Sequence, residues 1–506
     1  MCNITKSLFI FFHSHIKNEQ KARFKQKIDE FSFLFYNEFG FEKEKQIMYE
    51  IDFEKPVHVH FIGIGGISMS GLAEILLSEG FTVSGSDNSE SELTKRLREE
   101  GVRVNIGQSS DNITSDIDLV VYSAAIRRDN PEFGAAAEAN LPMLSRAELL
   151  GQMMRNYKYP IAVSGTHGKT TTSSMLSEIL LAENTDPTLT IGGILKSIGG
   201  NVRIGHSDYF LTEACEYTNS FLSFFPKYGI ILNVDADHLD FFKDLNDIRN
   251  SFRKFAELIP EDGALVINGE IENYGELTRS AKCPVITFGM SDEYDYYATD
   301  ITFNESAFSS YNMHTPKGEV IPVSLGVVGM HNVYNSLAAL AMADILKFDK
   351  ETGPEALKKC TGADRRFQIK GHLGSITIVD DYAHHPTEIA ATLSAAEKYP
   401  HEHLWVVFQP HTYSRTKALM NEFADVLKNA ENVILADIYA ARENDTLGIS
   451  SKDLKAEIEK RGGRCEYFRS FSEIEIFLLE NCNQGDLLIT MGAGDVYKIG
   501  EELLGK

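Results

Sequence analysis

The chain has 506 residues, which at about 100–200 residues per domain predicts three domains, and 43% of them are apolar and 24% charged, as in a soluble globular protein. Its net charge of −24 argues against nucleic acid or an anionic membrane as the main partner. Six scattered cysteines without a C-x-x-C pair indicate reduced, cytoplasmic thiols, and no apolar run approaches the roughly 20 residues of a membrane helix.

Residues 1–47 differ in character from the rest. They hold 9 of the 31 Phe and are slightly basic, with 8 Lys and Arg against 6 Asp and Glu. From Met48 the chain leads directly into a strand pattern. We expect Met48 to be the true start and residues 1–47 to be a non-native or disordered leader. A genuine amphipathic helix over Lys21–Phe35 is the alternative.

The first predicted domain, residues 48–157, opens with a βαβ unit. A buried strand (57–62) turns through Gly63-Ile-Gly65-Gly66-Ile-Ser68 into a helix (69–79), and the next strand ends at Ser86-Asp87. A glycine-rich turn with an acidic residue about 20 positions on is the layout of a dinucleotide site. Ser68 stands where the third glycine would be, so the pattern supports a pyrophosphate near Gly65 and Gly66 rather than NAD specifically.

The second predicted domain, residues 158–362, begins with a phosphate-binding pattern. A strand (161–163) precedes Gly165-Thr166-His167-Gly168-Lys169-Thr170-Thr171, and a helical pattern (173–182) follows. Backbone N–H groups and the helix N-terminus would face the phosphates, Lys169 would add a charge, and the Thr170 hydroxyl could hold Mg²⁺. An ordinary strand–turn–helix is the alternative, and we favour an ATP site.

Two further strands of this segment end in possible metal ligands. The strand at 209–213 ends in Glu213 and Glu216, and the strand at 228–234 is followed by Asp235, Asp237 and His238. Open α/β sheets bind ligands at the carboxyl ends of their strands, and oxygen ligands suit Mg²⁺. Asp-rich turns are also ordinary surface features, so the pattern alone leaves both interpretations open.

A strongly apolar helix is predicted after Gly329, and Asn332 is either its N-cap or an amide that recognises a base. The third predicted domain, residues 363–506, begins at Arg365-Arg366-Phe367 and alternates strands with helices, which predicts a parallel sheet. The fold class is therefore α/β, with three tandem α/β domains.

The ordered motifs resemble those of the Mur ligases, the ATP-dependent amide-forming enzymes of peptidoglycan precursor synthesis. They are the phosphate loop from Gly165, then Glu213, Asp237-His238, His331-Asn332-x-x-Asn335 and Arg365-Arg366-Phe367. The resemblance covers residues 55–500. It implies a Rossmann-like UDP-binding domain, a P-loop ATPase-like central domain and a Rossmann-like C-terminal domain that binds the amino acid.

Segments such as Asp380-Asp-Tyr-Ala-His384-His385-Pro-Thr-Glu and Phe408-Gln-Pro-His-Thr-Tyr-Ser-Arg415-Thr most resemble the branch of the family that adds L-alanine. The implied reaction joins L-alanine to the carboxylate of UDP-N-acetylmuramate. The carboxylate attacks ATP to give an acyl phosphate and ADP, and the amine then displaces phosphate. ATP and Mg²⁺ are the implied cofactors, and the enzyme is expected to be cytoplasmic and a monomer or homodimer.

The resemblance also implies a role for each site residue. Lys169, His238 and Arg366 would be catalytic, and Thr170, Glu213 and His238 would bind metal. His385 and Arg415 would bind the amino acid, since a guanidinium suits a carboxylate, although Arg415 in an intramolecular ion pair is the alternative. UDP-sugar would contact Gly65, Gly66, Ser68, Ser86 and Asp87. ATP would contact Gly165, Thr166, His167, Gly168, Lys169, Thr170, Thr171, His331, Asn332, Asn335, Arg366 and Asp381.

Two departures from the family pattern affect these expectations. Cys215 stands where many relatives carry a carboxylate, which leaves a metal role for that position in doubt, and Thr412 stands where relatives often carry Arg. The nearest alternative function is a recycling ligase that joins a whole tripeptide to the same nucleotide sugar. An NAD-dependent oxidoreductase would leave the phosphate loop unexplained, and a non-catalytic regulator would be expected to have lost Lys169 or His238.

Overall fold

The alternating strand and helix patterns form three β-sheets in the described residues of the computed structural model, which are 49–239, 241–441 and 443–506. The predicted leader 1–47, the proposed start at Met48 and the alternative helix over Lys21–Phe35 lie outside these residues. Residues 51–506 form one compact unit. In this described part, no helix has the length and apolar character to cross a bilayer.

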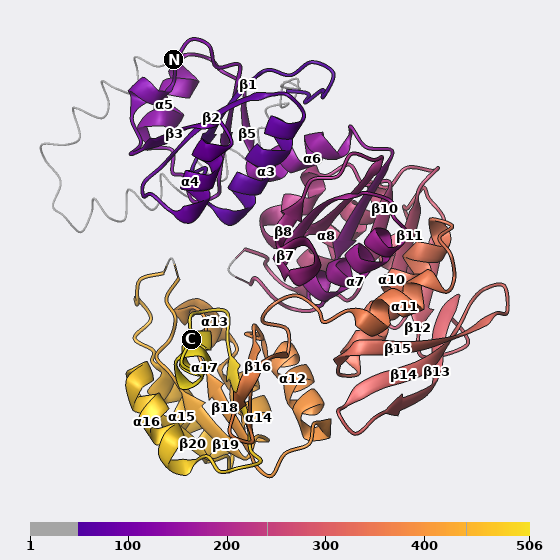
Figure 1. Cartoon of the computed structure of the whole chain (residues 1–506), viewed down its shortest axis with the longest axis vertical. Coiled ribbons are helices and arrows are strands. Elements are labelled where there is room, and N and C mark those ends of the chain that lie inside the picture. The colour runs from indigo at the N-terminus through magenta and orange to yellow at the C-terminus, as the bar shows by residue number, and fades with distance from the viewer. Residues whose placement is uncertain (1–48, 240, 442) are drawn as a thin grey trace, which may run out of the picture. The chain divides into compact units, whose positions relative to one another are not determined.

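The first sheet, which lies in the indigo and violet part of Figure 1, is parallel throughout, with the order β3-β2-β1-β4-β5. All five residues of β1 are buried, as expected of a central strand covered on both faces. The strands are β1 (His58–Ile62), β2 (Thr82–Asp87), β3 (Arg103–Ile106), β4 (Leu119–Tyr122) and β5 (Met143–Ser145). The helices are α3 (Ile67–Ser78), α4 (Glu92–Glu99), α5 (Pro131–Glu138) and α6 (Arg146–Met154), with a short 3₁₀ turn, η1 (Ser110–Asn112).

The central sheet has the order β15-β14-β13-β12-β11-β10-β6-β9-β7-β8. Its strands are β6 (Tyr159–Ser164), β7 (Thr188–Leu195), β8 (Gly200–Arg203), β9 (Tyr209–Ala214), β10 (Tyr228–Ile231), β11 (Ala264–Asn268), β12 (Val285–Gly289), β13 (Tyr296–Phe303), β14 (Phe308–His314) and β15 (Val320–Val328). Its helices are α7 (Lys169–Ala182), α8 (Leu245–Glu257), α9 (Tyr274–Thr278), α10 (His331–Ile345) and α11 (Thr352–Lys359), with η2 (Lys196–Ile198) and η3 (Tyr217–Ser223).

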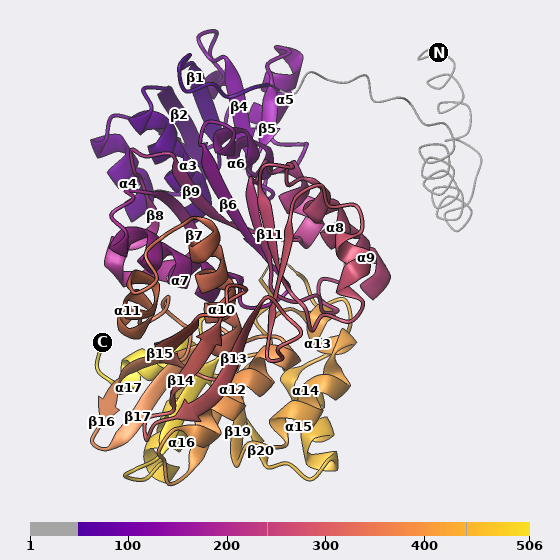
Figure 2. The ribbon, with the colours of Figure 1, turned by 90° about the vertical axis from the view of Figure 1, so that its right-hand side faces the viewer.

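The middle of this sheet is parallel, and the phosphate loop follows its strand β6. An antiparallel extension, β13 to β15, continues one side as long neighbouring strands (Figure 2). Helices α7, α10 and α11 share one buried apolar core with the sheet, which includes Leu176, Leu337 and Leu357. The apolar stripe of these helices therefore holds the start of α7, and with it the phosphate loop, against the sheet.

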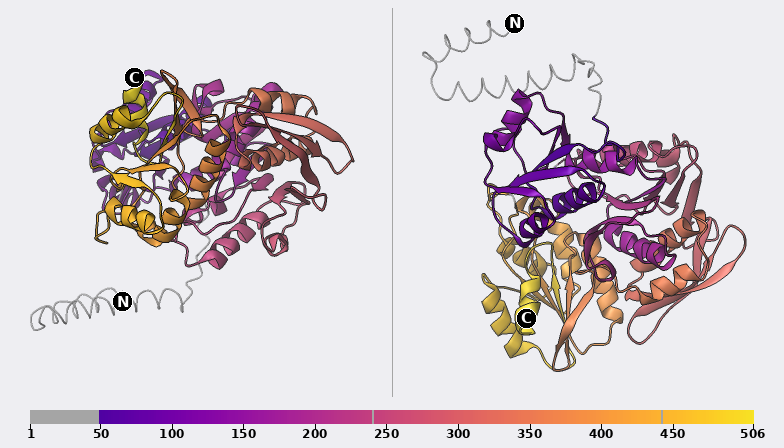
Figure 3. Two further views of the ribbon diagram at one scale, coloured as in Figure 1. Left: turned by 90° about the horizontal axis from the view of Figure 1, so that it is seen from below. Right: turned by 45° about the horizontal axis from the view of Figure 1, so that its top comes forward.

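The third sheet has the order β16-β17-β21-β18-β19-β20. Its strands are β16 (Gln368–Leu373), β17 (Ile376–Asp381), β18 (Leu404–Phe408), β19 (Asn432–Leu435), β20 (Cys465–Tyr467) and β21 (Leu487–Met491). Its helices are α12 (Pro386–Lys398), α13 (Tyr413–Ala418), α14 (Met420–Leu427), α15 (Ser451–Lys460), α16 (Phe471–Asn481) and α17 (Tyr497–Leu503). The sheet lies between two helical layers (Figure 3), each with its own apolar core.

The fold class is confirmed as three-part α/β, and each sheet lies within one of the predicted segments 48–157, 158–362 and 363–506. The predicted strands of the third sheet are parallel, and the edge strand β16 is an addition that was not predicted. Strands β16 and β17 are antiparallel because only Gly374 and Ser375 separate them, too few residues for a crossover. The exact domain boundaries stay a prediction.

Candidate functional site

The phosphate loop joins the buried strand β6 to helix α7, which begins at Lys169. Gly165 and Gly168 both have positive φ, at +143° and +82°. A Cβ at Gly168 would lie 2.6 Å from Asn335 Oδ1, so both the backbone angle and the close approach of α10 require glycine here. The loop thus presents its backbone N–H groups at a helix N-terminus, as an anion site requires.

Lys169 is held by the loop itself. Its Nζ donates to the carbonyl oxygens of Gly165 and Thr166 and, at 2.9 Å, to Glu216 Oε2. Burial opposes the charge of this amine, but the Glu216 carboxylate outweighs it and raises the pKa of Lys169 above its ordinary value. Lys169 is therefore a fixed positive charge beside the loop.

Thr170, Glu213 and Arg366, predicted from separate motifs, meet at one point. The Thr170 hydroxyl donates to Glu213 Oε2 at 3.1 Å, and Arg366 Nη2 donates to Thr170 Oγ1 at 3.4 Å. The N–H of Gly192 donates to the other Glu213 oxygen, and burial raises the pKa of Glu213. A hydroxyl and a carboxylate in contact beside a phosphate loop are the oxygen donors that Mg²⁺ takes.

His238 lies in the loop that follows the neighbouring strand β10, seven residues after Ile231, with a positive φ of +54°. Its Nε2 is 4.0 Å from Glu216 Oε1, and its ring packs 4.5 Å from the Tyr217 ring, centroid to centroid. Burial lowers the pKa of His238, although Asp237 and Glu216 oppose this shift. A neutral imidazole at this position can act as a metal ligand.

No group of three or more His, Cys, Asp or Glu side chains within the described ranges is arranged to hold a metal by itself. Any Mg²⁺ here would therefore also need oxygen atoms from the nucleotide or water, which is its usual mode of binding. The donors present fit that mode, because Thr170 and Glu213 form one pair and a carboxylate oxygen of Glu216, buried and without a hydrogen-bond partner, lies near His238.

A cavity of about 560 Å³ extends from the phosphate loop. It brings together eight of the predicted ATP residues, His167, Gly168, Thr171, His331, Asn332, Asn335, Arg366 and Asp381. Helix α10 begins at His331 with Met330 as its N-cap, so the alternative of Asn332 as an N-cap is wrong. The Asn332 amide instead donates to Val328 O at 2.7 Å and accepts from Asn335 Nδ2 at 2.9 Å.

Asp381, at the end of β17, organises the loop that carries Arg366. Its carboxylate accepts from the N–H of Phe367 at 2.9 Å and of Ala383 at 2.7 Å. Burial raises the pKa of Asp381 to about 6, against the opposing charge of Arg366. The Arg366 guanidinium lies 5.4 Å from the centroid of the Tyr382 ring. These contacts orient Arg366, in the loop before β16, toward Thr170.

His167 connects the phosphate loop to helix α12. Its Nδ1 lies 3.2 Å from Glu388 Oε1, and its Nε2 lies 3.4 Å from Asp235 Oδ2. Burial favours the neutral ring, but the two carboxylates prevail and raise the pKa of His167 to about 9. Glu388 is the last residue of the segment that begins at Asp380 and resembles the family, but no role for it was predicted from the sequence.

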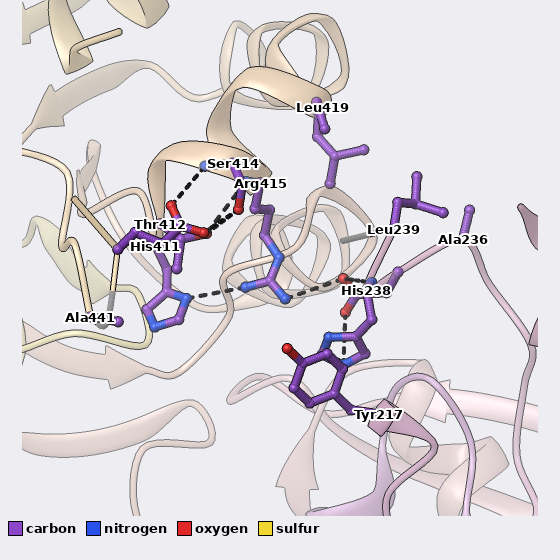
Figure 4. Close-up of a pocket in the computed structure, with 13 residues that line it drawn as sticks. Tyr217, Ala236, His238, Leu239, His411, Thr412, Ser414, Arg415, Leu419 and Ala441 are labelled. Atoms are coloured by element: carbon purple, nitrogen blue, oxygen red, sulfur yellow. Dashed lines mark hydrogen bonds and ion pairs between the residues drawn. The ribbon is translucent and has the colours of Figure 1, made fainter. Parts of the chain in front are cut away.

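A second cavity of about 660 Å³ is lined by Arg415, His411, Asp237, His238 and Tyr217, among others (Figure 4). Arg415 Nη2 donates to Asp237 Oδ1 at 3.2 Å, and Arg415 Nη1 lies 3.1 Å from His411 Nδ1. Burial of Asp237 is outweighed by Arg415 and His238, which lower the pKa of Asp237 to about 2. The alternative of an intramolecular ion pair for Arg415 is therefore realised here, in the wall of a cavity that His238 also lines.

The two predicted amino-acid residues do not share this cavity. His385 packs 4.9 Å from the His167 ring, toward the phosphate loop, whereas its neighbour His384 lies 5.7 Å from the His411 ring. His385 also accepts from the N–H of Thr387 at the start of α12. Helix α12 begins at Pro386, and the two histidines before it point to different partners. His384 is thus the histidine on the Arg415 side.

The glycine-rich turn of the first sheet holds the predicted UDP residues. The N–H of Gly65 donates to Asp87 Oδ2 at 2.9 Å, and Gly66 and Ser68 are exposed at the start of α3. Ser86 is fully buried, and its hydroxyl donates to Glu132 Oε2 at 2.6 Å. The Ser86 side chain is therefore buried beneath the turn, whereas Gly66 and Ser68 face solvent.

Three family models match the chain: "Mur ligase family, catalytic domain" over residues 58–158, "Mur ligase middle domain" over 163–343 and "Mur ligase, glutamate ligase domain" over 365–494. A UDP-N-acetylmuramate–L-alanine ligase of Agathobacter rectalis is 61% identical over 459 residues, or 91% of this chain and 100% of the relative. The corresponding ligase of Lachnospira eligens is 59% identical, over 90% of this chain and 100% of the relative.

Solved structures agree with these matches. The UDP-N-acetylmuramate–alanine ligase of Thermotoga maritima superposes with a TM-score of 0.73 at 30% identity, and the match covers 88% of this chain and 98% of that one. A murein peptide ligase of Psychrobacter arcticus shares the fold, with a TM-score of 0.65 at 24% identity over 89% and 98% of the two chains.

Proposed function

Since this chain belongs to the Mur ligase family, we propose that it joins L-alanine to the carboxylate of UDP-N-acetylmuramate in peptidoglycan precursor synthesis. The reaction consumes ATP, passes through an acyl phosphate and releases ADP and phosphate. The observation that carries the chemistry is the meeting of Lys169, Thr170, Glu213 and Arg366 at the phosphate loop. A cytoplasmic location stays a prediction.

L-Alanine is favoured over the tripeptide of the recycling alternative. The relatives at 61% and 59% identity are named as L-alanine ligases, whereas the murein peptide ligase of Psychrobacter arcticus is only 24% identical. Arg415 supplies two guanidinium N–H groups, which suit a carboxylate in bidentate fashion.

The residues act mainly by positioning and by charge neutralisation, as in other phosphoryl transfers. Lys169 and Arg366 would hold the β- and γ-phosphates from opposite sides and stabilise the charge that develops on the transferring group. His331, Asn332 and Asn335 would face the adenine, with Asn335 also closing over Gly168. The turn at Gly65 and Gly66 would hold the pyrophosphate of the nucleotide sugar through backbone N–H groups.

Thr170 and Glu213 would ligate one Mg²⁺, and His238 would ligate a second. Bound Mg²⁺ would neutralise phosphate charge. The incoming amine of L-alanine would approach from the Arg415 cavity, whose wall includes His238. The phosphate and amine sites would thus lie on either side of the Asp237-His238 turn.

Phosphate release from ATP tests this function directly. The purified chain would receive UDP-N-acetylmuramate with L-alanine, with L-Ala-γ-D-Glu-diaminopimelate, or with no amine. We expect release that requires L-alanine. Release that requires the tripeptide would identify the recycling ligase instead, and no release in any reaction would contradict both functions.

A further inference from the structure

Glu216 is a buried carboxylate that the proposed roles leave unused. It lies just after β9, beside Cys215, and is only 1% exposed. One oxygen, Oε2, accepts from Lys169 Nζ at 2.9 Å. The other, Oε1, is buried and accepts no hydrogen bond. A buried carboxylate oxygen without a partner is costly, so its persistence calls for a ligand that is bound in the working state.

The unpartnered oxygen points toward His238. Glu216 Oε1 and His238 Nε2 are 4.0 Å apart. With bonds of about 2.1 Å, two ligands of one octahedral Mg²⁺ are about 3 Å apart in cis positions and about 4 Å apart in trans. The observed separation falls within this range, so a cation fits between the two atoms after a small adjustment at most.

The charges around Glu216 also change when a nucleotide binds. Without it, Lys169 neutralises Glu216, and Glu216 is the only carboxylate among the described residues that forms an ion pair with Lys169. When phosphates take the Lys169 charge, the carboxylate loses its counter-ion. A divalent cation at Oε1 would replace it, since an uncompensated buried charge is strongly unfavourable.

We propose that Glu216 and His238 together ligate a divalent cation, and that Glu216 exchanges Lys169 for this cation when the nucleotide binds. This assignment rests on the proposed function for its nucleotide. Thr170 and Glu213 form the other metal position. Glu216 is thus a metal ligand in the working state and a counter-ion of Lys169 in the free state.

Mn²⁺ binding to the full chain tests the metal role. With a non-hydrolysable ATP analogue and UDP-N-acetylmuramate present, paramagnetic titration should count two Mn²⁺ per native chain and one in Glu216→Gln. Asp262→Asn is the matched control, because Asp262 forms a lysine–carboxylate pair with Lys227 outside the site, and it should keep two. Two Mn²⁺ in Glu216→Gln, or one in the native chain, would overturn the proposal.

The exchange is tested without any nucleotide. Lys169→Met should release Glu216 and tighten Mn²⁺ binding about tenfold, and the second change Glu216→Gln should remove this gain. Equal Mn²⁺ affinity in Lys169→Met and the double variant would overturn the exchange. Thermal unfolding of each variant checks folding. Because this titration uses only Mn²⁺, it is independent of whether L-alanine triggers phosphate release.

Discussion

At the scale of single residues, three cations of the site are already paired with carboxylates of the protein. Lys169 is bound to Glu216, Arg415 to Asp237 and His167 to two carboxylates. Each cation is thereby held in place before an anionic ligand arrives. Ligand binding must then exchange one partner for another rather than order a free side chain.

Removal of the Lys169 charge should separate catalysis from binding. We expect Lys169→Ala to lower kcat by about 10³-fold or more, because a cation on the transferring phosphoryl group is worth that much in related reactions. Binding of UDP-N-acetylmuramate, measured by calorimetry, should stay within about twofold of the native value, since Lys169 belongs to the central sheet. Equal loss of both would place the nucleotide sugar at the phosphate loop.

Arg415 should bind the carboxylate of the amino acid substrate. Arg415→Lys keeps the positive charge but cannot form bidentate hydrogen bonds with a carboxylate. We therefore expect KM for L-alanine to rise about tenfold. KM for ATP should change little, because Arg415 lines the other cavity. Steady-state kinetics with each substrate varied in turn measures both constants. An unchanged KM for L-alanine would leave Arg415 as a partner of Asp237 alone.

The effect of replacing His238 on turnover should depend on the Mg²⁺ concentration. We expect His238→Ala to weaken turnover and excess Mg²⁺ to restore part of it, because one protein ligand is lost while the phosphate ligands remain. Initial rates over a Mg²⁺ series give the apparent affinity. A rate that is insensitive to the substitution at every Mg²⁺ concentration would remove His238 from the metal site.

At the scale of secondary-structure elements, the contacts that matter join the phosphate loop to the third sheet. Helix α12 contributes Glu388 to His167, and the loop before β16 contributes Arg366 to Thr170. These pairs are separated by 221 and 196 residues in the sequence. The start of α7 is therefore clamped by distant segments that the local pattern of the loop does not reveal.

The His167 contact should make stability depend on pH. Its folded pKa, about 9, lies above the ordinary value of 6.5. The stabilisation is therefore complete below about pH 6.5 and is lost as pH rises through 9, by up to about 3 kcal/mol. Chemical unfolding of the native chain and of His167→Gln, from pH 6 to pH 10, should show a difference that shrinks over this range. A constant difference would contradict the charged state of His167.

The sequence predicted the elements that depend on local patterns. The phosphate loop, β1, β2 and the strands before Glu213 and Asp235 are short-range signals of apolar strands followed by glycine or polar turns. It could not predict that α10 is already helical at His331, because an N-cap differs from a first-turn residue only in its backbone angles. Likewise, His384 and His385 are adjacent and chemically identical, so only the path of the chain into α12 shows which one lies near His411.

The antiparallel extension β13 to β15 was also not predicted. Its strands pair within the segment 296–328, beyond the parallel part of the central sheet. Their apolar and polar alternation is equally compatible with a separate hairpin. The position of Arg366 beside Thr170 came only from the family resemblance, since nothing in a single sequence links residues so far apart.

At the scale of the whole molecule, the negative net charge of the protein repels its anionic substrates. The chain carries 73 acidic and 49 basic residues, and both ATP and the nucleotide sugar are anions. The long-range field is therefore repulsive, while the site itself contains the fixed cations Lys169, Arg366 and protonated His167. Specific binding depends on these short-range charges, which salt screens less than the distant ones.

Salt should therefore accelerate the capture of substrate. The Debye length falls from about 30 Å at 0.01 M to about 8 Å at 0.15 M ionic strength. We expect kcat/KM for UDP-N-acetylmuramate to rise severalfold over this range at constant free Mg²⁺, because the distant repulsion is screened first. Stopped-flow or steady-state rates measure it. A steady fall from the lowest salt would mean that local attraction dominates even at long range.

The order of the three sheets along the chain has a consequence for biosynthesis. Among the described residues, each sheet takes all its strands from one stretch of the chain, and none shares a strand with another. Translation proceeds at about 5–20 residues per second, so the synthesis of residues 158–362 takes about 10–40 s. The third sheet is made only after this. The phosphate loop can thus fold on the ribosome well before Arg366 and Glu388 are made. Nascent chains would gain the ability to cradle phosphate first, and the ability to turn over ATP only after the third sheet has been made.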